Sequence, residues 1–241
     1  MKTQIITITM ILAGMVLNAC DTIIGDRPSD EITTQHYDFT DYDQIETESA
    51  FSIYVAFSDT EENIEIEAND NLHQYMEVKK EGSTLKIGFR DNTGINGPAT
   101  LNAYITTKNV TGYSGSGASR FIVDNDISGK NASVFLSGAS RFKGELYVEN
   151  LSADLSGASV MQISGNADDT DLTASGASNI EDYEFNTDHL SIHLSGASQA
   201  SLTVSEKMDV TASGASVFRY KGQCIINSQN ITGGSQIINM N

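Results

Sequence analysis

The chain has 241 residues, enough for one or two domains with a substantial hydrophobic core. It carries 14 Lys and Arg against 32 Asp and Glu, a formal net charge of -18, and this acid excess excludes nucleic acid as a partner, because phosphate backbones are bound through clustered basic side chains. With 39% hydrophobic residues the chain is too apolar for a disordered acidic tail, so we expect it to fold.

Residues 1–19 have the pattern of a lipoprotein signal peptide. Lys2 precedes an apolar run, Ile5 to Leu17, which is shorter than the ~20 residues that a helix needs to cross a bilayer. The run ends in Leu17-Asn18-Ala19-Cys20, which resembles a bacterial lipobox, so we expect cleavage before Cys20 and acylation of its thiol. The acyl chains would hold the protein on a membrane of the cell envelope, and we expect the outer membrane, either on its periplasmic face or at the cell surface. The alternative is an ordinary signal peptide with an incidental cysteine.

Residues 20–36 carry acids, Gly and Pro without apolar periodicity, which predicts a flexible acidic tether. From residue 37 onward, apolar and polar residues alternate as they do in half-buried strands. The expected strands cover residues 51–57, 64–68, 85–89 and 101–105, with a turn within residues 78–85 and one weak helix candidate at 71–76. We therefore expect residues 37–241 to form one all-β domain, whose first part, residues 37–110, consists of irregular N-terminal coils.

The strongest signal is a repeat within residues 111–241. Ser-Gly-Ala-Ser occurs six times, beginning at residues 116, 137, 156, 175, 195 and 213, and a degenerate Thr-Gly-Gly-Ser follows at 232–235. A constant spacing of about 20 residues in a strand-rich chain predicts the stacked coils of a β-solenoid. Positions one and three before the motif and two after it are apolar in nearly every copy, as expected for side chains that stack in a shared core. The polar stretches between the motifs are predicted to form outward turns.

The motif has a steric explanation. In stacked parallel strands, which lie ~4.8 Å apart, a glycine at one corner of every coil permits a backbone conformation or a close approach that other residues cannot adopt. The glycines predicted to have this structural role are Gly117, Gly138, Gly157, Gly176, Gly196 and Gly214. The serines are expected to form hydroxyl ladders between coils. The alternative is a flat, serine-lined strip that binds a repetitive ligand such as a glycan.

The lipobox, the acidic strand-rich first half and the repeated Ser-Gly-Ala-Ser coils together resemble the family described as "putative auto-transporter adhesin, head GIN domain". The resemblance extends over residues 39–238. It implies a single-stranded right-handed parallel β-helix in a bacterial envelope protein of the Bacteroidota, with an adhesin-like role. The family brings no catalytic residues and no assigned function.

Motifs for chemistry are scarce. The sequence has no Gly-x-Ser-x-Gly elbow and no phosphate-binding glycine loop, and we expect no cofactor. His189 and His193 are predicted to face outward on one strand, ~13 Å apart, which is too far to share a metal ion. Cys224 is the only cysteine besides Cys20, and we expect it to be a small buried hydrophobe.

Charged residues of the repeats offer two further candidates. Asp168, Asp169 and Asp171 are weak calcium ligands or catalytic acids, because hard cations and polysaccharide-cleaving enzymes both use clustered carboxylates. Arg120 and Arg141 follow the motif in adjacent coils. We expect these arginines to face outward and to be balanced by acids such as Asp124 and Asp126, rather than to form an anion site.

Two functional classes are compatible with these features. The first is a non-enzymatic, lipid-anchored envelope protein whose elongated surface binds a glycan or a protein. The second is a polysaccharide-binding or polysaccharide-cleaving enzyme on the same scaffold. A homo-oligomer is also expected, because the last coil, residues 229–241, has no evident polar cap and an uncovered strand edge favours pairing.

Overall fold

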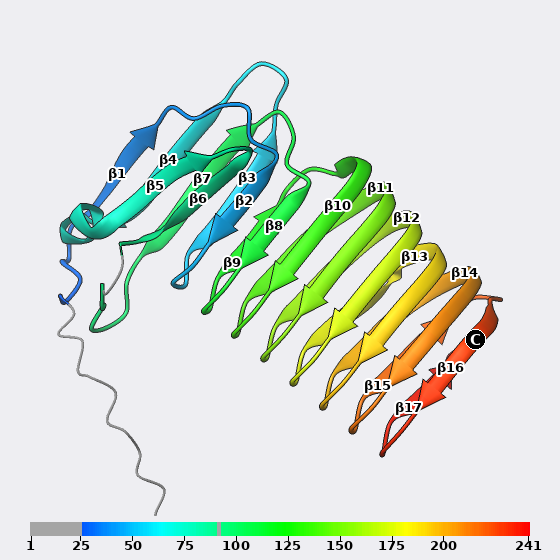
Figure 1. Ribbon diagram of the computed structural model, residues 1–241. Coiled ribbons are helices and arrows are strands. Elements are labelled where there is room, and N and C mark those ends of the chain that lie inside the picture. Colours follow the sequence, from blue (N-terminus) through cyan, green and yellow to red (C-terminus); the bar gives the residue numbers. More distant parts are fainter. Residues whose placement is uncertain (1–25, 91–92) are drawn as a thin grey trace, which may run out of the picture.

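A computed structural model of the chain describes residues 26–90 and 93–241, apart from the side chain of Asp182. The predicted signal peptide, Cys20 and the start of the predicted tether lie outside the described residues. Nearly all of the described elements are strands, and the parallel coils of about 19 residues form a β-solenoid of about seven turns (Figure 1). No helix within these ranges is long and apolar enough to span a membrane.

The first ten elements belong mostly to the part that precedes the repeats. They are β1 (Ile32–Tyr37), β2 (Gln44–Thr47), β3 (Ser52–Phe57), β4 (Asn63–Asn69), the short 3-10 helix η1 (Asp70–Tyr75), β5 (Met76–Glu81), β6 (Thr84–Phe89), β7 (Leu101–Thr107), β8 (Gly112–Gly115) and β9 (Arg120–Val123). The repeat coils comprise β10 (Ile127–Leu136), β11 (Arg141–Leu155), β12 (Val160–Ala174), β13 (Asn179–Leu194), β14 (Gln199–Ala212), β15 (Val217–Lys221), β16 (Ile225–Ile231) and β17 (Gln236–Asn239). All four strands and the turn expected before the repeats are present.

Each Ser-Gly-Ala-Ser corner joins two stacks of parallel strands. The stack that leads into the corners, here the pre-motif sheet, contains β8, the second halves of β10 to β14, and β16. The stack that leaves them, the post-motif sheet, contains β9, the first halves of β11 to β14, β15 and β17. The predicted β-solenoid with coils of about 20 residues is confirmed.

Side chains of the two sheets meet in a continuous core. Of the apolar columns predicted from the repeats, nearly every member is fully buried, including Tyr113, Phe121, Phe142 and Phe218. Ile231 and Ile237, in the last coil, are only partly buried. Stacking of equivalent positions therefore provides the apolar burial that stabilises each coil on its neighbour.

The polar stretches between motifs are not turns, contrary to the prediction. Residues 166–170 lie inside β12, and their parallel pairing continues around the bend, with Asn166 opposite Tyr147 and Asp169 opposite Asn150. In a stack of coils, a residue in the bend still pairs through its backbone with the equivalent residue of the neighbouring coil. Polar composition here therefore marks exposure to solvent rather than a break in the strand.

The N-terminal part is less coil-like than predicted. β4 pairs antiparallel with β7, β1 pairs antiparallel with β4, and β5 pairs antiparallel with β6. These strands cover the N-terminal end of both sheets (Figure 1). The expectation of a flexible tether up to residue 36 is wrong for its second half, because residues 32–36 belong to β1 and Asp26 forms a bridge with Ile95.

One coil lies out of chain order in the stack. β2 and β3 pair with β8 and β9 on one side and with β6 and β7 on the other, all in parallel. Their corner lacks glycine and uses Ser49 (φ 67°) and Ala50 (φ 65°) instead. The Ser116 N–H donates to the carbonyl oxygen of Thr47 at 3.0 Å, so this corner is the first of the stack.

A polar groove across the coils

The corner glycines occupy the positions predicted for them. The six motif glycines have φ between 71° and 76°, a region that L-residues with a Cβ rarely adopt. A Cβ on Gly157 would lie 2.4 Å from the carbonyl oxygen of Gly138, and the same distance recurs for Gly138, Gly176, Gly196 and Gly214. That oxygen accepts a 2.7 Å hydrogen bond from the N–H of Ala158. Both backbone conformation and close approach therefore require glycine.

The motif serines do not form the expected ladder. The second serine of each motif is buried, and in Ser140, Ser159 and Ser178 its Oγ donates to the carbonyl oxygen three residues earlier at 2.8 Å. Each of these hydroxyls closes its own turn. The first serine does link coils, since Ser156 Oγ and Ser175 Oγ donate to the carbonyl oxygens of Leu136 and Leu155 in the preceding coil at 3.4 Å, but it bonds to the backbone and not to another hydroxyl. In the Ser-Gly-Ala-Ser corners that the structure describes, the exposed residues are Gly and Ala, and the first serine is half-buried, so these corners do not present a row of freely exposed hydroxyls.

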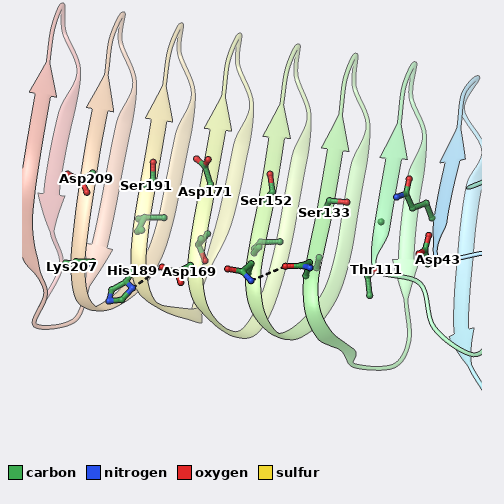
Figure 2. A pocket seen from close by; sticks show the side chains of 18 residues that line it. Asp43, Thr111, Ser133, Ser152, Asp169, Asp171, His189, Ser191, Lys207 and Asp209 are labelled. Carbon is green, nitrogen blue, oxygen red and sulfur yellow. Dashed lines mark hydrogen bonds and ion pairs between the residues drawn. The ribbon is translucent and has the colours of Figure 1, made fainter. Parts of the chain in front are cut away.

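A groove of about 710 Å³ runs along the pre-motif sheet, across the coils (Figure 2). Two polar columns form its sides. One column contains Asn131, Asn150, Asp169, His189 and Lys207, and the other contains Ser133, Ser152, Asp171, Ser191 and Asp209. The column between them, which includes Leu151 and Leu190, is buried. Because members of a column are one coil apart, polar groups repeat about every 4.8 Å along the groove.

His189 connects three coils within this groove. Its Nδ1 lies 2.9 Å from Asp169 Oδ1, and its Nε2 lies 3.0 Å from Glu206 Oε2. The hydrogen bond to Asp169, followed by that to Glu206, raises the pKa of His189 above its usual value. His189 and His193 both face outward as predicted, but His189 is held between two carboxylates instead of being only solvated.

Hydrogen bonds also order the two ends of the groove. Asn150 Nδ2 donates to Asn131 Oδ1 at 3.0 Å, which continues one column as an amide ladder. Asp209 accepts hydrogen bonds from Ser228 and from Asn227 Nδ2, and these bonds lower the pKa of its carboxyl. Amide and carboxylate groups of the groove are therefore held in position by hydrogen bonds, as recognition of an extended polar ligand requires.

The three weak calcium candidates are not brought together. Asp169 and Asp171 line the groove, but Asp168 does not, and Asp169 is bonded to His189. Among the described residues no group of three or more His, Cys, Asp or Glu side chains could hold a metal ion. Cys224 is half-buried against the core, and burial raises the pKa of its thiol, which disfavours the reactive thiolate.

The family model described as "Putative auto-transporter adhesin, head GIN domain" matches residues 41–224. The solved structure of a putative adhesin from Bacteroides fragilis is 21% identical, with a TM-score of 0.79, and the match covers 90% of this chain and 100% of that one. A putative lipid binding protein from Parabacteroides distasonis is 18% identical, with a TM-score of 0.69, covering 90% and 99%.

A putative adhesin from Parabacteroides merdae is also 18% identical, with a TM-score of 0.63 and the same coverage of both chains. No curated protein matches the chain. At these identities the structural likeness establishes the fold alone. The family match extends from before β2 to Cys224 and includes all six Ser-Gly-Ala-Ser corners. The resemblance seen in the sequence is thus confirmed, and the chain belongs to the family described as "Putative auto-transporter adhesin, head GIN domain".

Proposed function

We propose that the protein is a non-enzymatic, lipid-anchored protein of the outer membrane that presents its solenoid at the cell surface and binds an extended neutral glycan in the groove. The adhesin-like family supports a surface role. The observation that carries the ligand assignment is the pair of polar columns that repeat once per coil along the groove. A polymer lying along the groove would meet equivalent groups at each coil, so its contacts would add along its length.

Charge favours a neutral ligand over an acidic one. Asp43, Asp169, Asp171 and Asp209 all line the groove, where the basic side chains are Lys207 and the histidine His189. A ligand bearing carboxylates would face this acid excess, whereas sugar hydroxyls can donate to the carboxylates and accept from the serines and asparagines.

Removal of groove hydroxyls tests the proposal. The triple variant Ser133→Ala/Ser152→Ala/Ser191→Ala deletes three outward hydroxyls of one column without adding bulk. With each lost hydrogen bond contributing ~0.5–1.5 kcal/mol, we expect the Kd for a neutral glycan selected from a polysaccharide panel to rise at least about tenfold. Ser164→Ala/Ser201→Ala, on β12 and β14 but outside the groove, is the matched control and should leave the Kd unchanged.

Equal affinity of both variants, or no binding by any neutral glycan in the panel, would contradict the groove assignment. The acids of the groove also permit a second candidate, a polysaccharide-cleaving enzyme, because Asp169 and Asp171 stand two residues apart on one strand. Asp209, in the same column as Asp171, is also a groove acid, but its carboxyl pKa is lowered, which makes it unsuited to act as the general acid of such an enzyme. Release of new reducing ends from the bound glycan would favour this enzyme.

A further inference from the structure

Three basic side chains lie together on the post-motif sheet, away from the groove. Arg120 is on β9, and Arg141 and Lys143 are on β11, with all three exposed. They alternate with the buried Phe121 and Phe142, so they point outward from the sheet. Arg120 and Arg141 are direct partners in the parallel register of the two strands. Three cations thus occupy two adjacent coils of a strongly acidic protein.

These cations form no ion pair within the part of the chain that the structure describes, although Asp124 and Glu145 line a neighbouring hollow together with Lys143. No ion pair or side-chain hydrogen bond involves Arg120, Arg141 or Lys143 there, although Lys79, Lys86 and Lys108 all pair with glutamates. The expected balance by Asp124 and Asp126 is therefore not observed. Like charges placed directly opposite each other on neighbouring strands destabilise a sheet. The arrangement weakens the fold slightly and leaves room for an anion from outside.

The cations surround a hollow of about 430 Å³. Its lining includes one acid, Glu181, and that carboxylate already accepts hydrogen bonds from Gln162 Nε2 at 3.2 Å and from Asn179. The carboxylate of Glu181 is thus bonded to one amide group of its own coil and to one of the neighbouring coil. The guanidinium groups keep their planar donor forks available, and these forks match the geometry of a carboxylate.

An aromatic pair extends the same outward face. Tyr54 on β3 is in register with Ile122 of β9, and Tyr104 on β7 is in register with Tyr54. The two tyrosine rings stack at 5.1 Å between centroids, and Tyr104 is 42% exposed. From β7 to β11 there are three strand spacings, about 14 Å. A single extended polymer can therefore contact both the tyrosine pair and the three cations.

We propose that this strip, formed by Tyr104, Tyr54, Arg120, Arg141 and Lys143, binds a carboxylate-bearing polysaccharide. A chain one strand wide fits it, because the amphipathic tyrosines meet sugar rings while the cations pair with the carboxylates. Glu65 and Glu67 on the adjoining β4 lie at the tyrosine end of the strip, and Tyr104 donates a hydrogen bond to Glu67, so this end suits an uncharged part of the polymer while its carboxylates lie over the cations at the other end. A flat anionic membrane would cover both ends at once and would be pressed against these glutamates. The strip is separate from the groove, so either assignment can fail without the other.

Polygalacturonate is the probe, and neutral dextran and phosphatidylglycerol vesicles are the comparators. We compare the full mature chain with Arg120→Gln/Arg141→Gln and with Lys80→Gln/Arg90→Gln, a control that removes the same charge from residues outside the strip. We expect salt-sensitive binding of polygalacturonate that is about tenfold or more weaker in the arginine variant and nearly unchanged in the control. The triple serine variant of the groove should bind it normally.

The arginine variant should melt at the same temperature as the parent chain or higher, because one pair of like charges has been removed. This keeps a loss of binding from being confused with a loss of folding. Equal weakening in the arginine variant and its control, tight binding of dextran to the strip, absence of polygalacturonate binding, or binding of the vesicles alone would each overturn the proposal.

Discussion

Replacement of Gly157 by alanine probes the corner of the solenoid directly. The new Cβ would lie 2.4 Å from the Gly138 carbonyl oxygen, a distance that real Cβ atoms do not tolerate, so the backbones of two coils must move apart. The φ of 74° adds the left-handed conformation, which costs an L-residue roughly 1–2 kcal/mol. Movement of the carbonyl also weakens the 2.7 Å bond from Ala158, a contribution of about 0.5–1.5 kcal/mol.

The sum is about 2–4 kcal/mol for Gly157→Ala once the steric displacement is included. For a chain of this size each kcal/mol lowers the melting temperature by roughly 2–4 °C, so we expect a decrease of about 5–15 °C by calorimetry or circular dichroism. Gly157→Val, with a bulkier side chain, should lower it further.

Gly82→Ala is the matched control, because Gly82 has φ 62° and nothing lies within 4 Å of its hypothetical Cβ. This variant has the conformational cost without the collision, and we expect a loss of about 1–2 kcal/mol at most. Both variants gain equally from the lower entropy of the unfolded chain. Equal decreases in melting temperature for Gly157→Ala and Gly82→Ala would refute the close-approach explanation.

Three other predictions address the anchor, the groove histidine and the exposed edge. Cys20→Ser should abolish incorporation of labelled fatty acid and release the protein from the membrane fraction, and retention of either property would rule out the lipobox interpretation. Carboxylates raise the folded-state pKa of His189, so its contribution to the stability of the fold should be complete below about pH 6.5 and should disappear as the pH rises through the raised value. The melting temperature of His189→Gln should therefore lie below that of the parent chain at about pH 6 and approach it at about pH 8.5. A difference in melting temperature that stays constant with pH would contradict this. Ile225, 72% exposed on β16, should support self-association at high concentration that Ile225→Lys reduces in sedimentation experiments, whereas a strictly monomeric parent chain would argue against it.

The repeat made the coils predictable because it encodes both their period and their steric requirement. Glycine at 138, 157 and 176 marks corners that stack on one another, and the flanking apolar residues mark the core. The first corner of the stack, at Ser49 and Ala50, was not predicted, because it contains no glycine. Alternation in residues 64–68 indicated a strand but not its antiparallel direction, because side chains alternate with the same period in both kinds of sheet.

The groove was harder to predict than the coils. Asp169 and His189 are 20 residues apart, one coil, and this spacing could have indicated their contact. The column cannot be extended by counting, however, because extra residues lie in the bends. Glu181 pairs with Ser201, yet five residues later Asn186 pairs with Thr203, so the register shifts between them. The bulge decides which polar groups become neighbours, and its position was not evident from the sequence.

Labelling of intact cells tests the surface presentation of the solenoid most directly. A cysteine introduced as Ala158→Cys occupies an exposed corner, and Cys224→Ala removes the native thiol from the described part of the solenoid. A membrane-impermeant maleimide should label this variant on intact cells as completely as after permeabilisation of the outer membrane. A periplasmic control protein should remain unlabelled on intact cells and become labelled only after permeabilisation. Labelling only after permeabilisation would place the solenoid inside the envelope and contradict a role in adhesion at the cell surface.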